Sequence, residues 1–170
     1  MYQVGDNIVF GSKGICRVEH VGVLEIADMP RNKMYYTLNP YFIKGSKFYT
    51  PVDNDKVIMR PVIPKDEAMK LIDDIKNIDS LWVADEKRRE SEYKEAMKRC
   101  DCRELVKIIK TIYFRKQSRL KDGKKLTTID TKYFKLAEEN FYGELAISLN
   151  MDVKAVKEFV RTRVKKLVIE

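Results

Sequence analysis

The chain has 170 residues, of which 44% are hydrophobic and 35% charged, a composition typical of a folded protein. No segment approaches the roughly 18 consecutive apolar residues that a membrane-spanning helix needs. Three cysteines, an odd count, do not make a disulfide framework. The formal net charge of +8 favours an acidic partner, such as nucleic acid, an anionic membrane surface or an acidic protein. The alternative is a solvated surface that happens to be basic.

The basic excess lies mainly in the second part of the chain. Residues 1–60 hold 8 Lys and Arg against 6 Asp and Glu, a net charge of +2. Residues 61–170 hold 26 against 20, a net charge of +6. The first six residues show no basic stretch leading into an apolar one, so we expect no signal peptide. With the odd cysteine count, this favours a cytoplasmic protein.

Residues 7–59 have the pattern of short strands separated by turns. Glycines at 11 and 14, Pro30 with Asn32, and the Lys44-Gly45 pair mark the breaks. Pro51 should end a strand or lie at a sheet edge, because it has no N–H to donate. Close spacing of short strands predicts a small barrel or a strongly bent sheet. The expected strands cover residues 7–10, 15–23, 33–38, 46–50 and 57–59.

After Pro61 and Pro64, the spacing of the apolar residues changes from that of strands to that of helices. Pro64, followed by Lys65, Asp66 and Glu67, is typical of a helix start. Further helices are expected over 85–99 and 103–116, from near residue 130, and after an Asp152 cap. The sequence thus predicts an α+β protein with a β domain over 1–60 and an all-helical domain of about five helices over 61–170. The apolar stripes are Met69, Ile72 and Ile75; Leu105, Ile108, Ile109 and Ile112; Tyr133, Phe134, Ala137, Phe141 and Leu145; and Val153, Val156, Val160 and Val164.

Residue patterns that would indicate an enzyme are weak. His20 is the lone histidine, and it lies in an expected strand without a nucleophile pattern beside it. Cys100 and Cys102 lack the paired partner ligands of a zinc site, so core or junction cysteines are the better interpretation. The Gly11 to Gly14 turn is too short for a phosphate-binding loop. We therefore expect no catalysis, no metal, no cofactor and no small-molecule substrate.

The segment around the lone tryptophan, Trp82, carries more information. Trp82 precedes a charged helix in which Lys87, Arg88 and Arg89 follow within two turns. An aromatic ring beside cations suits DNA, because the ring can wedge between bases while the cations neutralise phosphates. A tryptophan that pins the linker onto the helical core is an equally good interpretation. Further basic clusters, which solvation alone can also explain, are Arg115, Lys116, Arg119, Lys121, Lys124 and Lys125, and then Arg161, Arg163, Lys165 and Lys166.

The ordered set of these features resembles the CarD/CdnL-like bacterial transcription regulators over nearly the whole chain. The matching segments are residues 4–10, Gly14, 18–19, 48–54, Trp82, 93–95, 105–110, 113–116, 137–138 and 143–146. The resemblance implies a Tudor-like N-terminal module, shared with the polymerase-interacting domain of transcription-repair coupling factors, that binds the β subunit of RNA polymerase. It also implies a helical domain that contacts promoter DNA at the upstream edge of the transcription bubble and stabilises the open complex without reading the base sequence.

By this resemblance Trp82 becomes a minor-groove wedge, and Lys87, Arg88, Arg89 and Lys94 become phosphate contacts. The basic cluster from Arg115 through Lys116, Arg119, Lys124 and Lys125 joins the candidate DNA surface. Tyr49 stands where the family often has an arginine two residues before the proline, so the expected polymerase contacts are Phe48, Tyr49 and Pro51. Trp82 and Tyr93 are eleven positions apart, a wider spacing than is usual in the family. The expected location is the cytoplasm, on the nucleoid through RNA polymerase.

Two other functions compete with this one. In a protein–protein adaptor, the helices would never meet DNA, Trp82 would pack inward, and basic groups would scatter over all faces. A hydrolase or redox protein built on Cys100 and Cys102 would lack a base and a pocket. If the protein instead joins RNA polymerase to promoter DNA, DNA binding by the helical domain alone should be weak. The polymerase-bound domain should then act as its tether.

Overall fold

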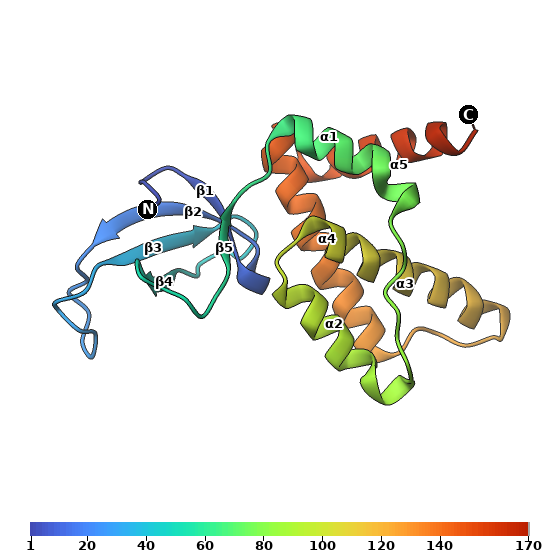
Figure 1. Ribbon diagram of the computed structural model, residues 1–170, viewed down its shortest axis with the longest axis horizontal. Helices are drawn as coiled ribbons and strands as arrows, with labels where there is room; N and C mark the ends of the chain where they lie inside the picture. Colours follow the sequence, from blue (N-terminus) through green and yellow to red (C-terminus); the bar gives the residue numbers. More distant parts are fainter. Residues whose placement is uncertain (170) are drawn as a thin grey trace. The chain divides into compact units, whose positions relative to one another are not determined.

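The computed structural model describes the backbone of residues 1–169 and the side chains of residues 1–166 (Figure 1). Contacts divide the chain between Val62 and Ile63 into an N-terminal β unit and a helical unit. The predicted boundary lay between residues 60 and 61. The fold class is α+β, as expected, with a bent antiparallel sheet followed by helices.

The β unit is a five-stranded antiparallel sheet in the order β4-β3-β2-β1-β5. A register shift in β2 between Val18 and His20 increases the local bend. The two edge strands β4 and β5 end at Pro51 and Pro61, where a missing N–H does no harm. The strands are β1 Asn7–Phe10, β2 Ile15–Gly22, β3 Tyr35–Pro40, β4 Phe48–Pro51 and β5 Met59–Pro61.

The sheet encloses a small core of its own. Alternation within the strands turns one set of side chains inward, and a short 3-10 turn η1 (Gly11–Lys13) joins β1 to β2. This turn suits glycine, because Gly11 and Gly14 both have positive φ. The buried cluster consists of Ile8, Phe10, Cys16, Val18, Tyr36 and Leu38.

The fifth strand lies two residues later than the predicted 57–59. Asn54 holds the preceding turn, because its side-chain oxygen accepts from the N–H groups of Lys56 and Val57 at 3.1 and 3.2 Å. Its amide nitrogen donates to the carbonyl of Val57 at 2.7 Å. Val57 and Ile58 are therefore part of an exposed turn, and pairing with β1 begins at Met59.

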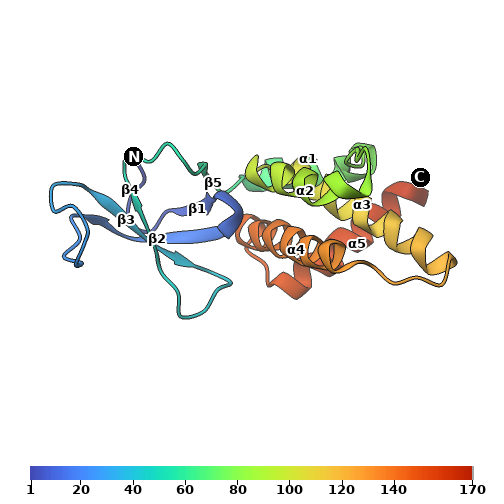
Figure 2. The same cartoon turned by 90° about the horizontal axis from the view of Figure 1, so that it is seen from below.

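The helical unit contains five α-helices and two 3-10 turns among its described residues (Figures 1 and 2). α4 packs against α3 and α5, and α1 packs against α4 and α5. Within residues 1–169, no helix combines the length and apolarity needed to cross a lipid bilayer. The elements are α1 Lys65–Asp74, η2 Ile75–Asn77, η3 Glu86–Arg88, α2 Arg89–Lys98, α3 Cys102–Lys121, α4 Thr128–Leu149 and α5 Val153–Ile169.

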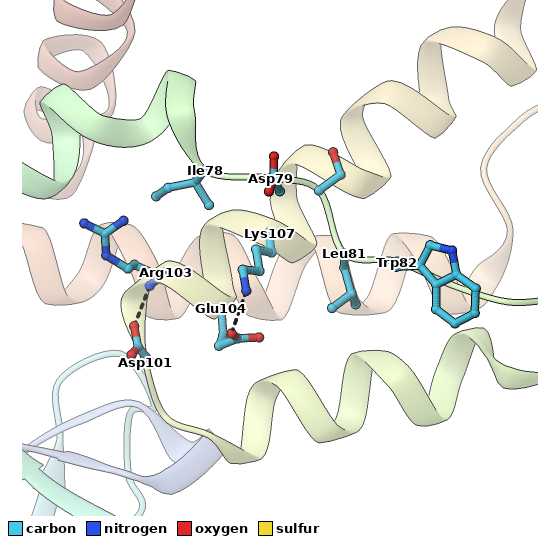
Figure 3. Close-up of a pocket in the computed structure, with 9 residues that line it drawn as sticks. Ile78, Asp79, Leu81, Trp82, Asp101, Arg103, Glu104 and Lys107 are labelled. Atoms are coloured by element: carbon cyan, nitrogen blue, oxygen red, sulfur yellow. Dashed lines mark hydrogen bonds and ion pairs between the residues drawn. The ribbon is translucent and has the colours of Figure 1, made fainter.

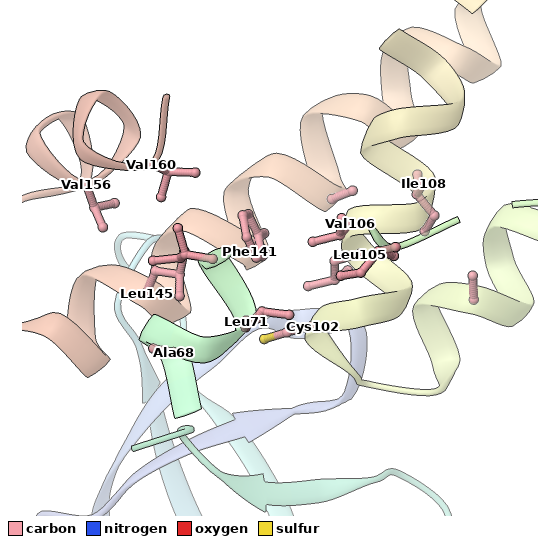
Figure 4. Packing of buried hydrophobic residues seen from close by; sticks show 14 of the residues in the cluster. Ala68, Leu71, Cys102, Leu105, Val106, Ile108, Phe141, Leu145, Val156 and Val160 are labelled. Atoms are coloured by element: carbon pink, nitrogen blue, oxygen red, sulfur yellow. The ribbon is translucent and has the colours of Figure 1, made fainter. Parts of the chain in front are cut away.

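The core of this unit lies where α1, α3, α4 and α5 meet (Figure 4). The predicted stripes on α3, α4 and α5 all contribute to it, with Ile109, Phe134, Val153 and Val164 partly buried at its margin. On α1, the buried residues are Ala68, Leu71 and Ile72, while the predicted Met69 lies at the margin, as does the predicted Ile75 of η2.

Side-chain caps begin three of the helices. Asp101 accepts from the backbone N–H of Arg103 at 2.7 Å at the start of α3, and Thr127 accepts from that of Asp130 at 3.2 Å at the start of α4. Asp152 accepts from the backbone N–H of Lys154 at 3.0 Å, confirming the predicted cap of the last helix.

Candidate nucleic-acid interface

Residues 78–85 form an extended segment between η2 and η3, fastened to α3 along its length. The Lys110 ammonium donates to the carbonyl of Ile78 at 2.5 Å. The N–H of Leu81 donates to the hydroxyl of Thr111 at 2.7 Å, and that hydroxyl donates back to the carbonyl of Lys107. Ile78 is buried and Leu81 packs against the helical core. The backbone next to Trp82 is therefore held in place by its neighbours.

Trp82 itself points away from the core, with 77% of the residue exposed. The interpretation in which this tryptophan pins the linker is wrong, because Ile78 and Leu81 do that instead. An exposed indole on a fastened segment is unusual, because tryptophan side chains are mostly buried in folded proteins. The ring is available to a partner.

A groove of about 530 Å³ opens beside this segment (Figure 3). Its wall combines apolar side chains with charges of both signs, and the Lys107 ammonium is paired with the Glu104 carboxylate at 3.0 Å. Phosphates are not favoured here, because three carboxylates face two cations. The lining residues are Ile78, Asp79, Ser80, Leu81, Trp82, Asp101, Arg103, Glu104 and Lys107.

An ion-pair network fastens the other end of the segment. The Arg115 guanidinium donates to both Glu86 oxygens at 2.7 and 2.8 Å, and its Nε donates to Asp130 at 2.6 Å. Arg89 donates to the same Glu86 at 3.1 Å and to the Tyr93 hydroxyl at 3.1 Å. The Tyr93 hydroxyl in turn donates to Asp130 at 2.9 Å. Glu86 of η3 is thus tied to both α2 and α3.

Burial and hydrogen bonding together set the pKa values of the two buried members of this network, Tyr93 and Asp130. The pKa of Tyr93 is raised to about 12, mainly by burial. The hydrogen bond to Asp130 also raises this pKa, whereas the hydrogen bond from Arg89 lowers it. Burial also tends to raise the pKa of Asp130, but the hydrogen bonds from Arg115, Tyr93 and Thr127 bring it below its ordinary value. Asp130 is therefore a buried carboxylate that the network keeps ionised.

This network takes two of the predicted DNA contacts out of the surface. The side chains of Arg89 and Arg115 are only 13% and 15% exposed, and their N–H groups point at Glu86, Asp130 and Tyr93. Moving the Arg115 guanidinium to a phosphate would take a cation from both Asp130 and Glu86, and moving that of Arg89 would take one from Glu86. Both guanidinium groups therefore help to hold the helical unit together, and a DNA contact by Arg89 or Arg115 stays a prediction.

The other predicted cations lie at the surface of the helical unit. The side chain of Asp85 accepts from the backbone N–H of Arg88 at 3.0 Å, which shapes η3 so that Lys87 and Arg88 are exposed a few residues after Trp82. Lys94 is exposed and only loosely paired with Glu90, at 3.6 Å.

The basic loop after α3 is also ordered from within. The Arg119 Nε donates to the carbonyl of Lys125 at 2.7 Å, and the N–H of Lys124 donates to the carbonyl of Arg119 at 2.8 Å. Lys116, Lys124 and Lys125 are exposed. Arg119 thus shapes the loop that presents the two lysines. In the last helix Arg163 pairs with Asp73, whereas Arg161 is exposed.

Two aromatic residues on α3 were missed as site residues. Tyr113 is 51% and Phe114 56% exposed. They belong to the segment that carries the family resemblance, but their rings had been given no role. The signal was present in the sequence, because both residues lie off the stripe formed by Leu105, Ile108 and Ile112.

In the β unit the predicted polymerase contacts lie on edge strand β4. Phe48 packs inward, with its ring centroid 6.0 Å from that of Phe10 and the Lys13 ammonium 5.7 Å above it. Tyr49 alternates outward and is 40% exposed, while Pro51 is half-buried. Of the three residues, Tyr49 is thus the one that a partner can reach most readily, whereas Phe48 packs against the interior of the β unit.

Comparison with known proteins assigns the β unit. Residues 2–63 match the sequence model of the family described as the CarD-like/TRCF RID domain. The matched residues include all five strands. A search of curated proteins found no match to the chain.

Proposed function

Because the β unit of this chain is a CarD-like/TRCF RID domain, a polymerase-interacting module, we propose that the protein is a non-enzymatic transcription regulator. Its β unit binds the β subunit of RNA polymerase through β4, with Tyr49 as the principal exposed contact. Its helical unit contacts promoter DNA at the upstream edge of the bubble and stabilises the open complex without reading sequence. The place of action is the cytoplasm, on polymerase engaged with the nucleoid.

The observation that carries the DNA half of this proposal is the exposed ring of Trp82 on a fastened segment. Leu81 is bound to α3 through Thr111 on one side, and Glu86 is bound to α3 through Arg115 on the other. Because the backbone on both sides of the ring is already held, binding there requires less further ordering of the chain. Such a ring can enter the minor groove as an apolar wedge, which many non-sequence-specific DNA-binding proteins use to open a base step.

The surrounding cations supply the electrostatic part. Lys87, Arg88 and Lys94 all lie within twelve residues after Trp82 and are exposed. Contacts to a few phosphates release few counterions, so binding to DNA alone should be weak. Because those contacts are electrostatic, added salt should weaken it further. Tethering by the polymerase-bound β unit raises the effective concentration of the helical unit at the promoter. The protein shifts the promoter equilibrium by its greater affinity for the melted state.

The test is the lifetime of open promoter complexes formed by the cognate RNA polymerase. We expect the wild-type protein to lengthen this lifetime. Trp82→Ala should shorten the lifetime about tenfold relative to wild type, because the lost ring no longer offsets the few kcal/mol that unstacking a base step costs. Polymerase binding, measured by pull-down, should be unchanged in Trp82→Ala and weakened in Tyr49→Ala. Trp82→Phe, which keeps a smaller wedge, should fall between Trp82→Ala and wild type.

Equal loss of both activities in Trp82→Ala would contradict the division of labour between the two units. No effect of wild-type protein on the lifetime, at several salt concentrations and promoters, would favour the adaptor. Of the two features expected of an adaptor, an inward-packed Trp82 is not observed, since Trp82 is exposed.

A further inference from the structure

The second half of α3 exposes two aromatic rings side by side. Tyr113 and Phe114 are both more than half exposed, and their rings meet edge to face with centroids 5.8 Å apart at 69°. Upstream of them α3 buries Leu105, Ile108 and Ile112. Two adjacent aromatic rings on the exposed side of a helix present flat apolar faces to solvent, which indicates a partner.

The charges around this aromatic pair are almost all positive. Residues 113–125 contain six Lys and Arg against one carboxylate, Asp122. Arg115 is engaged inside the domain and Arg119 in the loop. Lys116 lies one turn after Tyr113, and Lys121 lies two turns after Phe114 on the same face. The α3 aromatic surface is defined as Tyr113, Phe114, Lys116, Lys121, Lys124 and Lys125.

The combination fits one class of partner best. An apolar protein surface would have to desolvate the lysines without compensating them. Duplex DNA would neutralise the lysines but keeps its base faces stacked inside the helix. An unpaired strand offers both components, bare base faces for the rings and phosphates for the ammonium groups.

We infer that the α3 aromatic surface binds single-stranded DNA, with bases stacked on Phe114 and Tyr113 and phosphates held by Lys116, Lys121, Lys124 and Lys125. This inference rests on the proposed function, because promoter melting is what would supply the unpaired strand. It adds a second site to the duplex contact at Trp82. Phe114 lies one turn after Thr111, the residue that holds the backbone next to Trp82, so both sites belong to one region of α3.

The experiment uses the full chain and a labelled, mixed-sequence single-stranded oligonucleotide, with binding followed by fluorescence anisotropy. Tyr113→Ala with Phe114→Ala should weaken binding by about tenfold, which is typical of losing base–aromatic stacking. The same strand with abasic sites keeps its phosphates, and it should bind wild type as weakly as the variant binds the intact strand. Binding of the variant to the matching duplex should be unchanged.

Two further variants separate stacking from general apolar contact. Phe114→Leu keeps a bulky apolar side chain but no ring face, so it should lose affinity, whereas Tyr113→Phe should keep it. Leu120→Ala removes a neighbouring side chain that is 54% exposed and aliphatic, and it should have little effect. Circular dichroism should show that all variants keep their helices.

The inference is overturned if abasic and intact strands bind the wild-type protein equally. It is also overturned if Leu120→Ala and Phe114→Leu both lose equally little affinity for the strand. It is also overturned if the double variant loses affinity for polyglutamate or for phosphatidylglycerol vesicles but not for the strand. The Trp82→Ala protein distinguishes the two proposals. Normal strand binding with a shortened open-complex lifetime supports both, whereas a wild-type lifetime with normal strand binding removes the wedge and leaves the α3 surface.

Discussion

At the scale of single residues, Arg115 is the link between the tryptophan segment and the helical core. Its planar guanidinium can donate in parallel to the two oxygens of Glu86 while its Nε reaches Asp130. A lysine ammonium in its place has no fork geometry and could not serve both carboxylates in this way. The placement of Trp82 thus depends on a residue that sequence patterns alone had assigned to DNA.

The buried carboxylate of this network predicts a specific acid sensitivity. The pKa of Asp130 is lower in the folded protein than its ordinary value of 3.8, so the unfolded chain binds the proton more readily. Its contribution to the free energy of unfolding is complete above about pH 5 and is lost as the pH falls through the folded pKa. Asp130→Asn should cost about 3 kcal/mol at neutral pH and flatten the fall in stability between about pH 5 and 2.

Urea denaturation at a series of pH values measures this effect. Tyr93→Phe serves as the control, because it removes one hydrogen bond to Asp130 but keeps the carboxylate. It should cost about 1 kcal/mol and preserve most of the acid dependence. An acid slope in Asp130→Asn as steep as that of wild type would show that other carboxylates carry it.

At the scale of elements, one turn of α4 fixes where the helical unit starts. The Glu144 carboxylate accepts from the N–H of Ile63 at 3.0 Å and from the Cys102 thiol at 2.9 Å. Four residues later, the Ser148 hydroxyl donates to the carbonyl of Ile63 at 2.6 Å. The chain entering α1 and the start of α3 are therefore both held by the same face of α4.

Removing this carboxylate should loosen the helical unit. Glu144→Ala leaves the buried partners of Glu144 without its oxygens, which should cost about 2 kcal/mol. Glu144→Gln keeps an oxygen for Ile63 and should cost less. Urea denaturation followed by far-ultraviolet circular dichroism measures the stability of both variants. Ser91→Ala, at an exposed position of α2, is the control and should change the stability little. Equal costs for Glu144→Ala and Ser91→Ala would contradict the assigned role.

Local signals made much of the fold predictable. Turn glycines placed β1 and β2 to within a residue of their observed ends, and Asp152 marked the last helix through its cap. The end of α3 was not predictable in this way, because its buried apolar stripe stops at Ile112 while the helix continues to Lys121 without adding to the core. A stripe records only the part of a helix that packs against a core.

The candidate site was predictable in its chemistry but not in its geometry. Basic residue type cannot distinguish an arginine that faces solvent from one paired with a carboxylate distant in sequence. Arg115 meets Asp130 fifteen residues later and Glu86 twenty-nine residues earlier, so the pairing required the tertiary structure. The outward direction of Trp82 follows likewise from the fastening of Ile78 and Leu81, which depends on α3.

At the scale of the whole molecule, the chain carries two separate cores and an uneven charge. The β unit is built around its own buried cluster, and the helical unit around a larger one. The β unit carries a net charge of +2, and the helical unit carries +6. Each unit can therefore engage its own partner, while the covalent link supplies their combined effect.

This arrangement predicts that the two units work only when joined. Fragments 1–62 and 63–170, checked for folding by circular dichroism, should bind polymerase and DNA respectively. The DNA affinity of 63–170 should fall as salt is added, because its contacts are mainly to phosphates. An equimolar mixture should not lengthen the open-complex lifetime at concentrations where the intact chain does. A short covalent link between two binding modules gives an effective concentration in about the millimolar range, which the mixture lacks. A mixture as active as the intact chain would show that the DNA contact needs no tether, and that the helical unit binds the promoter with high affinity by itself.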